Sequence, residues 1–258
     1  MASTNPYPLP RERKLILSLL LLLAAASWAL LIWQAAAMNS QAMGMGLTMG
    51  MSAGLFIAIW VVMMIAMMFP TAAPMILMFT TVYAGKRQQS QAFVPTWLFV
   101  SAYLLIWTLV GLVAYPLALF AERVAGQSMW LMTNAPRIGG ALLVVAGLYQ
   151  LSPLKHICLA KCRTPLQFIL SSWRDGYGGA FRMGFVHGAY CLGCCWFLFV
   201  LLFPLGIMNI AVMALLTALI FAEKSVSLGR QISQIAGVAL IIYGVIVLFM
   251  PAALPTAM

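Results

Sequence analysis

Long apolar segments are the feature that most constrains how this 258-residue chain can fold. A helix needs about 20 apolar residues to cross the hydrocarbon core of a bilayer. These segments are too long for the strands of a membrane barrel and lack the alternation of such strands. The sequence therefore predicts an all-α, polytopic transmembrane helical bundle of about seven spans, between an arm at 1–14 and a tail at 251–258. The expected spans are about 15–36, 54–83, 96–120, 138–151, 182–203, 207–222 and 232–250.

The composition agrees with this class. Hydrophobic residues make up 64% of the chain and charged residues only 7%, whereas a soluble domain has about 25% charged residues. The first apolar segment is longer than the 7–15 residues of a signal-peptide core. We therefore expect it to be retained as a membrane helix.

The basic residues predict an orientation. With the N-terminus inside, twelve of the 14 Lys and Arg residues fall on the cytoplasmic side, and only Arg123 and Arg137 fall outside. This bias predicts an N-in, C-out protein of the bacterial inner (cytoplasmic) membrane. It also explains the net charge of +10 without nucleic acid, so the lipid bilayer is the expected partner.

A run of possible metal ligands lies in the fifth expected span. His187, Cys191 and Cys194 fall on one face of a helix, with Cys195 beside them. A single buried cysteine is usually only a small hydrophobic residue. An imidazole and three thiols together, at membrane depth, predict a metal site.

Two further groups could extend this site. Met63 and Met67 in the second span should lie at a similar depth, if the second and fifth spans are in contact. In the polar connection at 152–181, Cys158 and Cys162 would be one helical turn apart, with His156 nearby. Glu223 could act as an acceptor that orients His187, or be a charge at a helix end.

The segment 38–51 is rich in methionine and glycine and contains no charge. With the predicted orientation it lies outside. Its thioethers could collect Cu(I), or the segment could be a flexible apolar loop at the interface. The methionines concerned are Met38, Met43, Met45, Met49 and Met51.

Several motifs over about 55–250 resemble a bacterial family of predicted metal-binding integral membrane proteins that carries an unknown-function label. They are Trp60–Pro70, Tyr149–Lys155, Cys158, Cys162–Pro165, His187–Trp196 and Glu223-Lys224. The resemblance implies a multi-span membrane fold and a bound metal, but no established reaction. It does not extend to the segment 38–51.

These observations favour a membrane protein that binds a soft metal and acts in its transport, delivery or homeostasis. Thiolates and thioethers select Cu(I), so copper is expected before zinc. One alternative is a metal-binding or scaffolding subunit of a larger membrane complex, such as a copper enzyme. Another is a membrane thiol–disulfide oxidoreductase that uses Cys191 and Cys194, whose spacing is typical of redox pairs.

Other enzyme classes find little support. The sole aspartate, Asp175, lies in a polar connection, so a Ser-His-Asp site is not credible, and no glycine-rich phosphate loop is present. The few carboxylates also argue against an ordinary proton-coupled transporter. The sequence therefore favours a binding protein over an enzyme.

Overall fold

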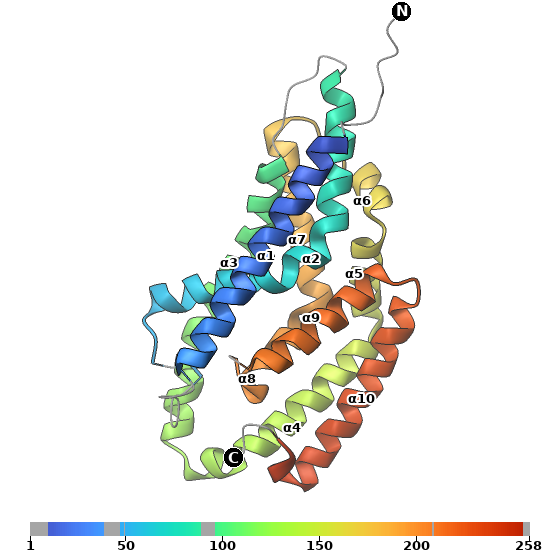
Figure 1. Ribbon diagram of the computed structural model, residues 1–258. Helices are drawn as coiled ribbons and strands as arrows, with labels where there is room; N and C mark the ends of the chain where they lie inside the picture. Colours follow the sequence, from blue (N-terminus) through green and yellow to red (C-terminus); the bar gives the residue numbers. More distant parts are fainter. Residues whose placement is uncertain (1–9, 39–46, 49, 89–95, 208, 255–258) are drawn as a thin grey trace, which may run out of the picture.

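The computed structural model describes residues 10–38, 47–48, 50–88, 96–207 and 209–254. Over these residues the chain is helical and forms no strand. The start of α1 and the end of α10 lie at opposite ends of an elongated bundle (Figure 1). The helices are α1 Pro10–Met38, α2 Ala53–Gln88, α3 Thr96–Gly126, α4 Met129–Leu151, α5 Pro153–Arg163, α6 Pro165–Ser172, α7 Gly176–Val200, α8 Leu202–Leu205, α9 Ile210–Ser225, α10 Gly229–Phe249 and the 3₁₀ turn η1 Pro251–Ala253.

Six stretches in the described part of the chain are long and apolar enough to cross a membrane: α1, α2, α3, α4, the α7–α8 run Gly176–Leu205, and α10. The expected sixth span at 207–222 corresponds to α9, which has 16 residues. At 1.5 Å per residue α9 is about 24 Å long, less than the hydrocarbon core of about 30 Å. The expected number of seven spans is therefore not supported. The N-in orientation stays a prediction.

The polar connection expected at 152–181 contains two short helices, α5 and α6. Ser152 caps α5 by accepting a hydrogen bond from the backbone N–H of Lys155 at 3.2 Å. Pro153 and Pro165 occupy the first turns of α5 and α6, where a missing N–H costs nothing. The expectation that Cys158 and Cys162 would be one turn apart if this segment were helical is confirmed.

A tryptophan of α1 compensates a defect in α2. Pro70 lies inside α2 and has no N–H, so the Ala66 carbonyl loses its helical donor. The indole Nε1 of Trp28 donates to that carbonyl at 3.1 Å. A buried backbone acceptor is thereby satisfied, and α1 is fixed against α2.

Glycines bring α4 and α10 into backbone contact. A Cβ built on Gly147 would lie 2.6 Å from the Gly237 carbonyl oxygen, and one on Gly140 would lie 3.0 Å from that of Gly244. Small residues of this kind allow close packing of membrane helices. Each interface position therefore has no room for a side chain.

We predict that Gly147→Ala destabilises the protein by about 1–3 kcal/mol, because the new methyl group meets rigid backbone rather than a movable side chain. The measurement is the thermal unfolding midpoint in detergent. Gly178→Ala is the matched control, since a Cβ at Gly178 meets nothing within 4 Å. Equal midpoints for the two variants would contradict the packing argument.

Candidate metal centre

All five cysteines are free thiols and belong to one region, which we call the cysteine cluster: Cys158, Cys162, Cys191, Cys194 and Cys195. The three thiols of α7 are almost completely buried, at 1% exposure each, and Cys162 is buried on α5. The sequence placed Cys158 and Cys162 in a separate inner pair. The structure joins them to the α7 thiols.

The contact between α5 and α7 depends on a missing side chain. A Cβ built on Gly193 would lie 2.8 Å from the sulfur of Cys158, so glycine at this position lets α5 approach α7. One turn further along α5, the thiol of Cys162 is a neighbour of the Cys194 thiol on α7, and the two interact. Thiols from two helices therefore lie side by side in the cluster.

The two α5 thiols are neutral at neutral pH. Burial, and then the neighbouring Cys194, raises the pKa of Cys158. The hydrogen bond with Cys194, and then burial, raises the pKa of Cys162 well above its ordinary value. A metal that binds these thiols must therefore displace their protons.

Cys191 is the polar centre of the α7 part of the cluster. Its carbonyl oxygen accepts from the thiols of Cys194 at 3.1 Å and Cys195 at 2.8 Å. Its own sulfur contacts the Tyr103 hydroxyl at 3.1 Å and the Lys224 ammonium at 3.0 Å. The α7 cysteines thus share one buried hydrogen-bond network with α3 and α9.

Lys224 is a site residue that the sequence did not identify. It lies in the last turn of α9, where a basic residue usually means only a favourable helix end. Besides Cys191, its ammonium reaches the Thr71 hydroxyl of α2 at 3.5 Å. The sequence marked Lys224 only as part of the Glu223-Lys224 motif, because its contact with Cys191 joins residues that are distant in the chain.

Glu223 takes part in a buried ion pair. Its carboxylate accepts from Lys155 at 2.8 and 2.9 Å and from the Gln150 amide at 3.0 Å. Lys155 is completely buried and Glu223 nearly so. The carboxylate thereby joins α9 to α4 and α5. The expectation that Glu223 orients His187 stays a prediction.

His187 lies on the same side of α7 as Cys191 and Cys194, as expected, but among aromatic rings. It stacks on Phe99 and Tyr103 of α3, and Phe168 of α6 meets it edge-on, with centroid separations of 5.6–5.9 Å. Its Nδ1 is buried without a hydrogen-bond partner. The imidazole therefore has an uncommitted nitrogen close to the cluster.

A cavity of about 190 Å³ lies beside the cluster. Residues of α2, α5, α7 and α9 form most of its wall, and it includes side chains with soft donor atoms and with positive charge. The lining residues are Thr71, Pro74, Met75, Cys162, Arg163, Pro165, His187, Lys224 and Ser225. We call it the cysteine-side cavity.

Met63 and Met67 are buried in the same hydrophobic core as the cysteines, at 1% and 0% exposure. The contacts that bring α2 to the site come one turn or more later, from Thr71, Pro74 and Met75. The two expected methionine ligands therefore stay a prediction. Met75 is the thioether that lines the cavity.

His156 lies on α5, and both of its ring nitrogens are buried without a hydrogen-bond partner. Burial, followed by the charges of Arg230 and Lys155, lowers its pKa. These neighbours are basic residues rather than thiols. A ligand role for His156 therefore stays a prediction.

The methionine-rich segment lies largely outside the described residues, which include neither Met43, Met45 nor Met49. Two described residues beside them are fixed to α3. The Thr48 hydroxyl donates to Glu122 at 3.0 Å, and the Tyr115 hydroxyl donates to the Met51 carbonyl at 3.3 Å. Metal collection by this segment stays a prediction.

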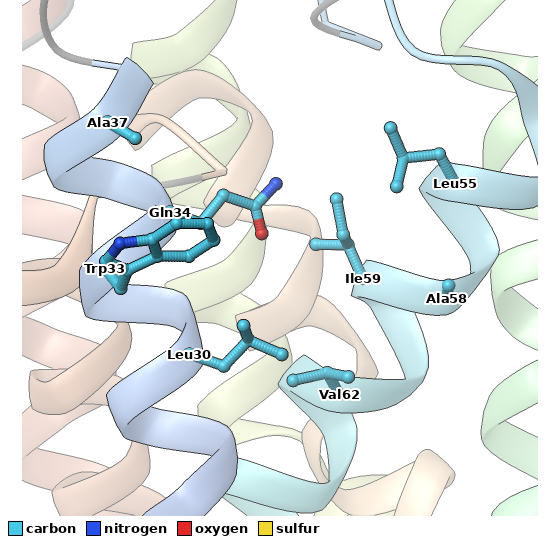
Figure 2. Close-up of a pocket in the computed structure, with 8 residues that line it drawn as sticks. All are labelled: Leu30, Trp33, Gln34, Ala37, Leu55, Ala58, Ile59 and Val62. Carbon is cyan, nitrogen blue, oxygen red and sulfur yellow. The ribbon is translucent and has the colours of Figure 1, made fainter.

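A second, larger cavity lacks the ligands that a copper site needs. Its volume is about 490 Å³. Figure 2 shows it between α1 and α2, with a wall that includes Leu30, Trp33 and Ile59. None of its lining residues is a cysteine, histidine or methionine. Its apolar wall suits lipid chains rather than a soft cation.

Within the part of the chain that the structure describes, no three His, Cys, Asp or Glu side chains converge in a geometry that could hold a metal ion. The cluster is therefore not a preformed site of the closed, four-ligand kind that structural zinc requires. A pair of thiolates can suffice for Cu(I), which favours soft ligands. The Cys162–Cys194 pair fits that smaller requirement.

The comparisons with known proteins add a family. A family model described as "PpoB2: Copper chaperone" matches residues 57–247, about three quarters of the chain. Neither the curated proteins nor the solved structures include a match to the chain. The matched region contains the whole cysteine cluster and the residues that surround it.

We predict that Glu223→Ala destabilises the protein by about 3–5 kcal/mol, because Lys155 is left as a buried charge without its partner. The measurement is the thermal unfolding midpoint in detergent. The double variant Lys155→Met/Glu223→Leu is the control, since it removes both charges and should lose less than the single variant. A double variant that is as unstable as Glu223→Ala would contradict the ion-pair argument.

Proposed function

The chain belongs to this copper chaperone family, and on that premise we propose that it is a membrane-embedded chaperone that holds Cu(I) as cargo between α5 and α7 and passes it on. Six long apolar helices support the membrane setting. The bacterial inner membrane, predicted from the basic residues, is part of the proposal. Delivery rather than catalysis is the role that the cluster supports.

One observation carries the proposal: α5 packs against α7, and this contact makes the thiols of Cys162 on α5 and Cys194 on α7 interacting neighbours. Two thiols already in contact can become two ligands of one soft cation with small side-chain movements. Cys191 lies about one turn before Cys194 on α7 and is the proposed third copper ligand during transfer. Thiolates favour Cu(I) over harder ions.

The charge of the loaded site supports the same ligands. Cu(I) with two thiolates carries a net negative charge, which is costly to bury unless a cation is near. The Lys224 ammonium lies 3.0 Å from the Cys191 sulfur and supplies that cation. Lys155 cannot do so, because its charge is already balanced by Glu223.

Copper is favoured over zinc at this cluster. Zinc is almost always bound by four ligands in structural sites. Among the described residues no three suitable ligands converge. A two-thiolate Cu(I) site needs fewer ligands than the cluster provides.

We predict that the purified protein, reduced and loaded with Cu(I), retains about one copper per chain. The double variant Cys162→Ser/Cys194→Ser should lose most of this copper, since it removes both ligands of the proposed pair. Elemental analysis after passage over a chelating resin measures the difference. Thermal unfolding checks that both proteins are folded.

Cys195→Ser is the matched control. Its thiol is equally buried on α7 and donates to the Cys191 carbonyl, but it is not one of the proposed ligands. It should therefore keep its copper. Unchanged copper in the double variant, with folding intact, would refute the proposed function.

A further inference from the structure

The cysteine-side cavity has a wall that the proposed function does not yet use. It combines soft donors, Cys162, Met75 and His187, with two cations, Arg163 and Lys224. Both cations are held in place. Arg163 donates to the carbonyls of Val226 and Ser227 at 2.8 Å, and Lys224 contacts Cys191.

Cys162 joins this cavity to the buried thiols. It is the one member of the cysteine cluster among the lining residues. Its thiol also contacts Cys194, whose neighbour Cys191 lies deeper against Tyr103. A ligand that reaches the cavity therefore meets Cys162 before the α7 cysteines.

The charges of the wall decide what can enter. No Asp or Glu is among the residues that line the cavity in the described part of the chain. Two fixed positive charges in a concave site attract anions and repel a bare cation. Free Cu(I) is therefore disfavoured there, whereas a Cu(I) complex of two thiolates, which is anionic, is favoured.

Resting on the proposed function, we infer that the cysteine-side cavity is an exchange port for an anionic Cu(I)–thiolate complex of a small thiol, and that Cys162 is its first protein ligand. A volume of about 190 Å³ suits a small molecule rather than a protein segment. His187 and Met75 add neutral donor atoms in the same wall.

The transfer step is a ligand exchange. The bond between copper and the sulfur of one donor thiolate breaks, and a bond between copper and Cys162 Sγ forms. The thiol proton of Cys162 goes to the released thiolate, which leaves as a neutral thiol. In a second exchange of the same kind, the bond between copper and the remaining donor thiolate breaks, copper binds Cys194 Sγ, and the thiol proton of Cys194 leaves with the second donor thiol. Copper stays Cu(I) throughout.

The test compares two thiols of similar size and opposite charge as Cu(I) donors to the full chain in detergent: mercaptoethanesulfonate, which is anionic, and cysteamine, which is cationic. Stopped-flow spectroscopy follows the rate of loading. We expect loading from the anionic donor to be about tenfold faster or more, with the preference shrinking as salt is raised. Equal rates at low salt would overturn the proposal.

Two variants assign the preference to the cavity wall. Arg163→Gln should reduce the ratio of the two rates, whereas Arg163→Lys, which keeps the charge, should preserve it. A ratio that is unchanged in Arg163→Gln would contradict the role of the wall. Unfolding midpoints show whether both variants keep the fold.

Cys162→Ser should slow loading from both donors, while Cys195→Ser should load at the normal rate. Loading of Cys162→Ser at the normal rate would show that another residue receives the metal. Faster loading from a Cu(I)-bearing cysteine peptide than from mercaptoethanesulfonate would overturn the small-thiol assignment. A normal copper content of the unsubstituted chain at equilibrium, lost in Cys162→Ser/Cys194→Ser, leaves the proposed function standing whatever the loading rates, so the two failures are distinguishable.

Discussion

The carboxylate of Glu223 is the point on which the arrangement of the site depends. It receives hydrogen bonds from Lys155 of α5 and Gln150 of α4, and it belongs to the last turn of α9. A charge buried away from water must be paired, so these three helices are held together at one place. That attachment fixes α5, the helix that carries Cys158 and Cys162, relative to α9 and α4.

Two adjacent residues at the end of α9 have different roles: Glu223 holds the fold together, and Lys224 contacts the cysteine cluster. Glu223 is committed to Lys155, so it cannot neutralise Lys224. The Lys224 ammonium instead contacts the Cys191 sulfur and the Thr71 hydroxyl. The short helix α9 thus places the positive charge of Lys224, which Glu223 does not neutralise, beside the thiols. A buried two-thiolate Cu(I) complex is anionic and needs a positive charge of this kind nearby.

The sequence was sufficient for what depends on local pattern. Hydrophobic length predicted the helical class and most of the apolar helices, and helical period placed His187, Cys191 and Cys194 on one face of α7. It failed where partners are distant in the chain. Nothing local shows that Lys224 meets Cys191, or that Gly193 makes room for Cys158. The segment that forms α9 was counted as a span because its run is apolar, although a helix of 16 residues is short for one.

The hydrogen bond from Trp28 to the Ala66 carbonyl also bears on how the protein is made. Pro70 gives α2 a carbonyl that would be unsatisfied in lipid if α2 entered the membrane alone. Synthesis proceeds from the N-terminus, so α1 is available before α2 is complete. The Trp28 indole is therefore already present when α2 inserts. The order of the two helices along the chain lets the Ala66 carbonyl find its donor as soon as α2 enters the membrane.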